Sequence, residues 1–351
     1  MSDDPELIPV RADEGLDVTR LAAWLRGKLP VAEGTLELGQ FGGGHANLTY
    51  LLRFGETEYV LRRPPLGPIA PSSHDMAREH RVLADLWRVY PLAPRSYLLC
   101  ADEAVIGAPF HVMERRRGIV IRTDLPARFQ GDSGLARRIG ETIVDALADL
   151  HKVDPDTAGL SELGRPEGFV ERQLGGWTKR WHAAKEADDP RLDAVAAWLE
   201  SNRPPSQTAS LLHNDPKLDN MIVGGEDPAR AVAVLDWDMC TRGDPLMDLG
   251  YLLTFWGEAG DPEPWIGAAS MPTWREGFPS RAEAIQRYAE STGFDLSAIQ
   301  WYHVFGTFKI AVVLQQIYIR FVRGQTQDQR FAPFGERVAA LIDKAAVLAG
   351  L

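Results

Sequence analysis

Lysine is scarce in this chain of 351 residues, and a long stretch of the chain has none. Only seven of the 38 basic residues are lysines, and no lysine lies between residues 29 and 151. A permanently charged cation in that stretch must therefore be an arginine. The 49 acidic residues outnumber the basic ones, which gives a net charge of −11. Proteins that bind nucleic acid or anionic lipid need a basic surface, so we expect neither of these partners.

The chain has only two cysteines, and its first residues lack the pattern of an export signal. Cys100 and Cys240 lie 140 positions apart and match no metal-ligand spacing, which is typical of a reduced chain in the cytoplasm. The N-terminus begins with acidic residues, where a secretory signal would carry basic residues and then an apolar stretch. The longest apolar segment, around residues 310–319, contains two glutamines and is too short to cross a bilayer. It predicts a buried helix in a cytoplasmic protein.

The first third of the chain has the pattern of a small antiparallel sheet. Apolar runs typical of strands occur at residues 35–41, 48–54, 58–63, 96–100 and 110–113. Turns that contain glycine separate the first three runs, as in β-hairpins. Apolar residues at helical spacing predict a first helix at 18–29 and one at 74–90 that packs on this sheet.

The rest of the chain is mostly helical in pattern. Apolar residues at helical spacing predict helices at residues 135–151, 166–187, 191–201, 280–292, 295–321 and 334–348. A short β-rich segment at 211–235 lies between them. We therefore predict an α+β fold of two lobes, with residues 1–115 around the sheet and residues 116–351 mostly helical.

The densest cluster of functional polar residues lies in that β-rich segment. Asp215 and Asn220 are five positions apart in a loop that contains a proline, and Asp236 ends an apolar run 21 positions after Asp215. Carboxylate and carboxamide oxygens at strand ends are ligands for a hard divalent cation, and Mg2+ is usually held by one or two carboxylates plus substrate phosphates. A loop carboxylate beside such a cation can accept a proton from a substrate hydroxyl.

This spacing resembles the catalytic loop of protein kinases, in which an Asp is followed five positions later by an Asn and a metal-binding Asp ends a downstream strand. The segments HNDPKLDN at 213–220 and LDWDMCTRGDPLMDLGYLL at 235–253 are more similar to the aminoglycoside phosphotransferase and choline kinase-like family. The second segment resembles the subgroup of kinase-like domains that are associated with acyl-CoA dehydrogenases. The resemblance covers residues 41–251. It implies a protein-kinase-like fold, in which the N-terminal lobe covers the nucleotide and the C-terminal lobe carries the catalytic loop and the substrate pocket.

The resemblance also implies a role for each residue of the cluster. Asp215 would orient or deprotonate the attacking hydroxyl. Asn220 and Asp236 would hold Mg2+ on the phosphates of ATP. His213 would brace the loop by hydrogen bonding, and Asp248 would be a structural carboxylate behind the site.

Residues 41–52, FGGGHANLTYLL, resemble the hairpin that covers the nucleotide in this family. Gly43 and Gly44 would let backbone N–H groups approach phosphate oxygens without interference from a Cβ atom. Without the downstream motifs, these glycines would equally indicate an ordinary hairpin turn, and Asn47 either reaches a phosphate or caps that turn. Residues 110–114 would form the hinge, where the backbone around Met113 meets adenine.

A kinase also requires a cation on the third strand that holds the α- and β-phosphates and pairs with a Glu on the next helix. The lysine-free stretch includes that strand, so Arg62 or Arg63 must supply the cation if any residue does. Arginine can pair with carboxylate and with phosphate through two N–H groups, and strand alternation places the two arginines on opposite faces of the sheet. We favour Arg62 from its position in the motif, with Glu79 on the following helix as its partner.

Together these features predict an ATP- and Mg2+-dependent phosphotransferase, a small-molecule kinase that phosphorylates a hydroxyl group. The acceptor is a hydroxy acid or hydroxyacyl compound, or an aminoglycoside-like molecule. The alternative is a degenerate kinase that serves as a nucleotide-sensing or protein-binding module, because Arg62 replaces the usual lysine and Asn214 replaces the family's glycine. No oligomeric state is predicted.

Residues 255–274 contain three tryptophans and three prolines. This segment either packs in the core beneath a long loop or forms the wall of a substrate pocket. An aromatic wall without strong acidity would favour a hydroxy acid or acyl thioester over a polycationic aminoglycoside.

Overall fold

The structure, a computed structural model, describes residues 6–43, 47–66, 75–185, 189–206 and 208–351. The chain forms two compact units. The first unit consists of Met1–Arg117, Ala158–Leu160 and Ala233–Cys240, and the second of Gly118–Thr157, Ser161–Val232 and Thr241–Leu351. The segment that carries Asp236 therefore folds with the N-terminal part of the chain.

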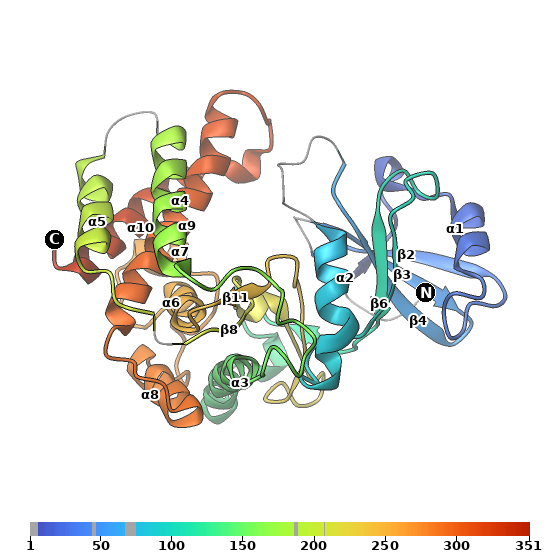
Figure 1. The fold of residues 1–351 in the computed structure, drawn as a ribbon, viewed down its shortest axis with the longest axis horizontal. Helices are drawn as coiled ribbons and strands as arrows, with labels where there is room; N and C mark the ends of the chain where they lie inside the picture. The colour runs from blue at the N-terminus through green and yellow to red at the C-terminus, as the bar shows by residue number, and fades with distance from the viewer. Residues whose placement is uncertain (1–5, 44–46, 67–74, 186–188, 207) are drawn as a thin grey trace. The chain divides into compact units, whose positions relative to one another are not determined.

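The first unit is an antiparallel sheet with a helix on each side (Figure 1). Its six strands follow the order β1-β2-β3-β4-β6-β5. The strands are β1 (Leu7–Ile8), β2 (Leu36–Phe41), β3 (Leu48–Phe54), β4 (Thr57–Arg63), β5 (Ser96–Cys100) and β6 (Phe110–Glu114). The helices are α1 (Val18–Leu25) and α2 (Met76–Asp85), with short 3-10 helices η1 (Ala12–Glu14) and η2 (Leu86–Arg88). The predicted antiparallel sheet with a helix packed on it is confirmed.

Strand alternation gives this sheet two different faces. Leu52 of β3 and Leu61 of β4 are fully buried and pack in one cluster with Leu21 and Leu25 of α1. The neighbouring positions in each strand point to the opposite face, where α2 packs on β5 and β6. Gly55, with a φ of 58°, makes the tight turn between β3 and β4, because glycine adopts this conformation without a steric penalty.

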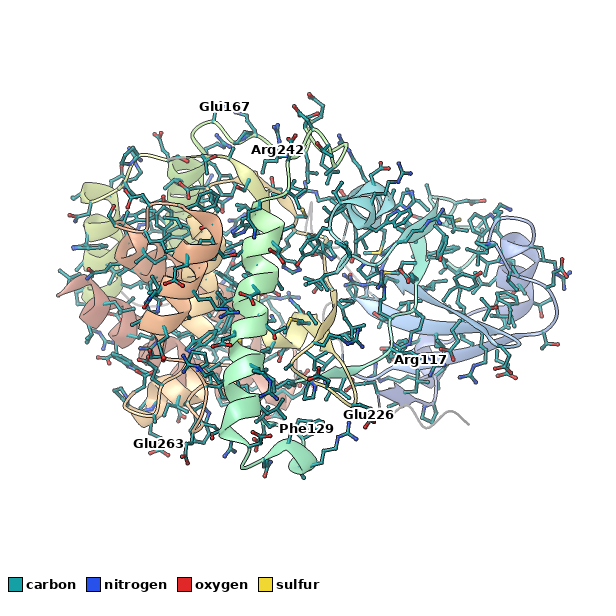
Figure 2. The ribbon with its side chains drawn as sticks, turned by 90° about the horizontal axis from the view of Figure 1, so that it is seen from below. Arg117, Phe129, Glu167, Glu226, Arg242 and Glu263 are labelled. Atoms are coloured by element: carbon teal, nitrogen blue, oxygen red, sulfur yellow. The ribbon has the colours of Figure 1, made fainter. Side chains whose placement is uncertain are left out.

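The second unit is mostly helical. Its helices are α3 (Ser133–His151), α4 (Phe169–Ala184), α5 (Pro190–Ser201), α6 (Leu246–Phe255), α7 (Glu263–Ala268), α8 (Arg281–Thr292), α9 (Ile299–Val322) and α10 (Phe334–Ala349), with short 3-10 helices η3 (Ala127–Phe129), η4 (Leu218–Asn220) and η5 (Gln329–Phe331). A three-stranded sheet has the order β10-β9-β7, from β7 (Ile119–Val120), β9 (Met221–Val223) and β10 (Ala231–Val234), whose last two residues belong to the first unit. A second pair joins β8 (Ser210–Leu212) to β11 (Thr241–Gly243). In Figure 2, Phe129 lies near the N-terminal end of α3 and Arg242 lies toward its C-terminal end.

Helices α6 and α9 cross at very short range because each has a glycine at the crossing. A Cβ atom on Gly250 of α6 would lie 2.2 Å from the backbone oxygen of Tyr302. A Cβ atom on Gly306 of α9 would lie 2.6 Å from the backbone oxygen of Gly250. The two backbones therefore touch where no side chain would fit, and the flanking side chains of α6 and α9 are brought together.

Helix α9 is also, among the described residues, the one helix long and apolar enough to cross a bilayer. It runs over 24 residues and extends well beyond the apolar segment 310–319, so length alone does not rule out a membrane span. However, 61% of its most apolar window is buried inside the protein, where α9 packs against α4, α6 and α10. This burial is typical of the core helix of a soluble protein.

Candidate active site

The segment HNDPKLDN forms the loop between β8 and β9 in the second unit. Asp248, in the first turn of α6, is buried and holds this loop from behind. Its two carboxylate oxygens accept the backbone N–H groups of His213 at 2.6 Å and Asn214 at 2.9 Å. His151, the last residue of α3, contacts the same carboxylate at 3.3 Å. The loop is thus anchored to two helices.

Asn214 adopts the left-handed backbone conformation, with a φ of 67°. Glycine adopts this conformation freely, and asparagine tolerates it better than most other residues. Asn214 therefore meets a backbone requirement at this position that a glycine would also meet. The replacement, which suggested a degenerate kinase, is compatible with an intact loop.

Asp215 is held on several sides and stays partly exposed. Lys217 Nζ lies 2.8 and 3.1 Å from its two carboxylate oxygens, and Asn220 Nδ2 donates to its Oδ2 at 2.8 Å. A hydrogen bond with Tyr251 also reaches this carboxylate. The ring of His213 accepts the backbone N–H of Asp215 at 3.3 Å. Because the Asp215 side chain is still 19% exposed, this oriented carboxylate is accessible to a substrate hydroxyl.

The same contacts orient Asn220 for a cation. Its Nδ2 donates to both the side chain and the backbone oxygen of Asp215, so its carboxamide oxygen is directed away from Asp215. Within the described part of the chain, nothing donates to that oxygen. An uncharged oxygen held in this way is a suitable ligand for a hard cation.

A buried lysine that was not predicted from the sequence lies beside this loop. Lys309 of α9 is 6% exposed, donates to the backbone oxygen of Asn214 at 3.2 Å and lies 4.1 Å from the ring centre of Tyr251. Burial lowers the pKa of Lys309 to about 8, although the charges of Asp248 and Asp215 oppose the shift. A charged residue directly before the longest apolar segment was the only sequence signal, and it did not indicate a partner.

In the first unit, a buried network of charges joins β4, α2 and the segment after β10. Arg62 pairs with Glu79 through Nη1 and with Asp236 through Nη2, the latter at 2.7 Å. Glu79 also lies 3.1 Å from Nε2 of His111 and accepts the backbone N–H of Trp237 at 3.2 Å. Burial alone would raise the pKa of Glu79, but the charge of Arg62 and the contacts with His111 outweigh burial and lower this pKa to about 2.

The two candidate arginines face opposite sides of the sheet, as strand alternation requires. Arg63 Nη1 donates to the backbone oxygen of Ile106 at 3.0 Å, and Ile106 belongs to the cluster around α1. Arg62 instead faces the carboxylates of Glu79 and Asp236. The geometry therefore favours Arg62 over Arg63 for a contact with phosphate.

Asp236 lies in a crowded group of carboxylates and has a left-handed φ of 70°. Arg62 bonds its Oδ1, and no described residue donates to its Oδ2. Burial and the charges of Asp236 and Glu79 raise the pKa of Asp238 to about 7, and Asn47 donates to Asp238 Oδ2 at 3.4 Å. A divalent cation would offset this concentration of negative charge.

The donor chemistry of these residues fits Mg2+. Among the described residues, no three His, Cys, Asp or Glu side chains gather as a self-contained metal site. Mg2+ takes few protein ligands and completes its shell with water and substrate phosphates, so it needs no such group. Asp236 and Asn220 offer hard oxygen ligands of the required kind.

The other predicted nucleotide contacts are spread over the first unit. Gly43 is exposed in the bend after β2, and Gly44 lies outside the described residues. Asn47 is buried immediately before β3. Met113 is buried in β6, where it pairs with Val60 of β4. These positions leave their contacts with a nucleotide as predictions.

In the tryptophan-rich segment 255–274, one residue packs in the core and its neighbour lies near the loop 213–220. Trp256 is fully buried, and its Nε1 donates to the backbone oxygen of Pro279 at 2.9 Å. Next to it, the ring centre of Phe255 lies 5.6 Å from Lys217 Nζ. Core packing is therefore confirmed for Trp256, and a wall of a substrate pocket stays a prediction for the rest of the segment.

Residues 37–295 match the family model described as the phosphotransferase enzyme family, APH. The chain belongs to this family. As a family member, it is a small-molecule kinase. Acyl-CoA dehydrogenase family member 10 from Mus musculus is 31% identical over 349 residues, which cover 97% of this chain and 32% of the relative. The chain thus spans about a third of the length of this curated relative, and the resemblance to kinase-like domains of such proteins is confirmed.

Two solved structures resemble this phosphotransferase. A structure from Ralstonia eutropha, provisionally described as an aminoglycoside phosphotransferase, is 29% identical, has a TM-score of 0.82 and covers 96% of this chain and 99% of its own. The GDP complex of aminoglycoside 2'-phosphotransferase-IIIa is 14% identical, has a TM-score of 0.60 and covers 94% of this chain and 99% of its own. The second likeness concerns the fold alone. The protein-kinase-like fold is confirmed.

Proposed function

We propose that this phosphotransferase uses ATP and Mg2+ to phosphorylate a hydroxyl group of a small molecule. The observation that carries the proposal is the arrangement of Asp215, a partly exposed carboxylate held by Asn220 and Lys217. In this proposal, residues 1–115 cover the nucleotide and residues 116–351 carry the loop and the acceptor pocket. The enzyme acts in the cytoplasm.

In the proposed reaction, Asp215 orients the acceptor hydroxyl and takes its proton as the new O–P bond forms and the bond to the leaving ADP breaks. Asn220 and Asp236 hold Mg2+, which when bound neutralises charge on the phosphates. Arg62 contacts the α- and β-phosphates, and Glu79 keeps the guanidinium in place. Catalysis then rests mainly on positioning and on stabilisation of charge.

The nucleotide contacts of the first unit complete this proposal. The backbone at Gly43 and Gly44 approaches the phosphates, Asn47 lies beside them, and the backbone around Met113 meets adenine. The structural relative solved with GDP supports a nucleotide site in this fold. A comparison of ATP with GTP in the same assay tests the choice of base.

For the acceptor, we favour a hydroxy acid or hydroxyacyl compound over an aminoglycoside. Lys217 pairs with Asp215, the charge of Lys309 interacts with Asp215, and Arg180 in turn faces Lys309. These cations lie against aromatic rings, as Arg180 does at 4.4 Å from the ring centre of Trp177. Such surroundings repel a polycation and attract an acid. A relative named for acyl-CoA dehydrogenase supports an acyl acceptor.

One observation favours the alternative of a degenerate kinase that senses nucleotide or binds protein. Arg62 pairs with Asp236, the same residue that is proposed to hold Mg2+. A nucleotide would have to draw the guanidinium onto its phosphates. In a degenerate kinase this ion pair would persist and phosphate transfer would not occur.

An ATP-consumption screen separates the two functions. The acceptors are hydroxy acids, hydroxyacyl-CoA thioesters, amino alcohols and aminoglycosides, each with and without Mg2+. We expect ATP turnover with a hydroxylated acid or thioester, and a loss of roughly a hundredfold or more in Asp215→Asn, since this variant cannot take the proton. Turnover that is unchanged in Asp215→Asn, or no binding of ATP with Mg2+, would contradict the proposal.

A further inference from the structure

Lys309 is a buried cation that the proposed reaction does not use. It lies in the middle of α9, among fully buried apolar neighbours such as Phe308 and Val312. Burial of an ammonium group is unfavourable unless other groups compensate its charge. Within the described part of the chain, Lys309 forms no ion pair with a carboxylate. The direct contacts that stabilise its positive charge are the backbone oxygen of Asn214 and the ring of Tyr251.

The first of these contacts reaches the residue directly before Asp215. The backbone of Asn214 forms hydrogen bonds with two helices. Its N–H donates to Asp248 of α6, and its carbonyl accepts from Lys309 of α9. A non-glycine residue in the left-handed region persists only where its surroundings hold it. Lys309 is one of the residues that hold Asn214 in this conformation.

The second contact reaches the Asp215 carboxylate itself. The ring of Tyr251 lies 4.1 Å from Lys309 Nζ, and the hydroxyl of the same residue hydrogen-bonds Asp215. The close crossing at Gly250 and Gly306 places α6 and α9 so that this pair can form. Lys309 therefore touches both the backbone and the side-chain support of Asp215.

We propose that Lys309 is a positioning residue for phosphate transfer, which holds Asn214 and Tyr251 so that Asp215 meets the acceptor hydroxyl in the reactive orientation. This inference rests on the proposed function. The ammonium form is the working state, because the positive charge is what attracts both the carbonyl and the aromatic face. Activity should therefore depend on the protonation of a residue that does not touch the reacting atoms.

The groups facing Lys309 determine when it loses its proton. Asp248 of α6 and Asp215 of the loop stabilise the ammonium, whereas Arg180 of α4 and Lys217 of the loop destabilise it. Burial is the largest influence, and the resulting pKa is about 8. The positioning should therefore fail as the pH rises through this value.

A titration by NMR tests the coupling without an activity assay. Protein with 13C-labelled lysine side chains has only seven lysines to resolve, and the signal that disappears in Lys309→Arg identifies Lys309. We expect this signal to titrate at about pH 8. In Asp215→Asn the pKa of Lys309 should fall further, because the stabilising carboxylate charge is gone. Lys344 of α10, a buried lysine that donates to the backbone oxygen of Thr254 at 3.0 Å, is the matched control and should titrate unchanged.

The dependence of kcat on pH then tests the positioning role with an acceptor from the screen. In the parent enzyme, kcat should fall above about pH 8. Lys309→Arg should abolish this alkaline fall, because arginine keeps its charge. Lys309→Met should lower kcat about tenfold below about pH 8, remove the alkaline fall and leave KM for ATP unchanged, since misplaced reacting groups slow the chemical step. Lys344→Met should retain both the rate and the alkaline fall.

Two results would overturn the inference. One is a Lys309 signal whose titration does not respond to Asp215→Asn. The other is an alkaline fall in kcat that persists in both Lys309→Arg and Lys309→Met. A parent enzyme without turnover of any acceptor would overturn the proposed function instead, and the NMR titration would still decide whether Lys309 is coupled to the loop.

Discussion

At the scale of single residues, the candidate site concentrates unusual backbone geometry. Among the described residues, Asn214 and Asp236 are the two non-glycine positions with a positive φ. Asn214 directly precedes the proposed base Asp215 and donates its backbone N–H to Asp248. Asp236 is itself a proposed ligand of Mg2+ and pairs with Arg62. Strain of this kind persists where contacts on every side determine the conformation.

The two arginines of β4 offer a test in which the control lies next to the target. Arg62→Ala should weaken binding of ATP with Mg2+ by tenfold or more, because it removes the arginine of the pair that faces the carboxylates and that we propose to contact the phosphates. Arg63→Ala should have a much smaller effect, because Arg63 faces the cluster around α1. Isothermal titration calorimetry measures both. Equal losses would show that Arg62 is not the phosphate contact.

Part of the candidate site could be predicted from the sequence because the spacing of its residues is distinctive. Asp215, Asn220 and Asp236 follow a pattern that short stretches of sequence carry. Lys309 and Tyr251 do not, since their contacts depend on how two distant helices cross. For this reason Asp248 and His213 could be predicted behind the loop from the resemblance, but Lys309 and Tyr251 could not.

At the scale of secondary structure, elements with one buried face were predicted well, whereas the fully buried α6 was not. The strand expected at 48–54 is β3 with the same bounds, and the helix expected at 280–292 is α8, where Ser280 forms a capping box with Glu283. Helix α6 was not predicted as a helix. All of its residues are buried, so it lacks the alternation of apolar and polar faces that marks a helix in a sequence.

The crossing of α6 and α9 should not tolerate even a methyl group. Gly250→Ala should lower the free energy of unfolding by about 1–3 kcal/mol, because the new Cβ would overlap the backbone of Tyr302. Gly175→Ala is the matched control in α4, where nothing lies within 4 Å of an added Cβ. That change should be neutral or stabilise the protein by up to about 1 kcal/mol, through helix propensity. Urea unfolding measures both, and equal effects would argue against a close crossing.

At the scale of the whole molecule, the few lysines make stability depend on pH in an unusual direction. Burial lowers the pKa of Lys344 to about 7 and that of Lys309 to about 8, whereas the unfolded chain keeps both near 10.5. Between these values the unfolded state binds more protons than the folded state, so the free energy of unfolding should increase as the pH rises.

Lys344→Met tests this dependence. Urea unfolding at about pH 7 and about pH 9 should show a smaller increase in the free energy of unfolding for Lys344→Met than for the parent, because one of the two titrating groups is gone. Lys152→Met, at an exposed position after α3, serves as the control and should retain the full increase. The same increase in all three proteins would mean that folding does not lower the pKa of Lys344.

The lysine-free stretch also affects how this enzyme can be detected chemically. Nucleotide probes that label kinases acylate an amine beside the phosphates, and β4 offers a guanidinium instead. In the whole first unit the sequence provides one amine on a side chain, Lys28, which lies at the end of α1 and donates to Trp24. A survey of cellular kinases with amine-reactive nucleotides would therefore find no lysine on β4 to label. At the proposed nucleotide site, Arg62 would escape such reagents because a guanidinium is not acylated as an amine is.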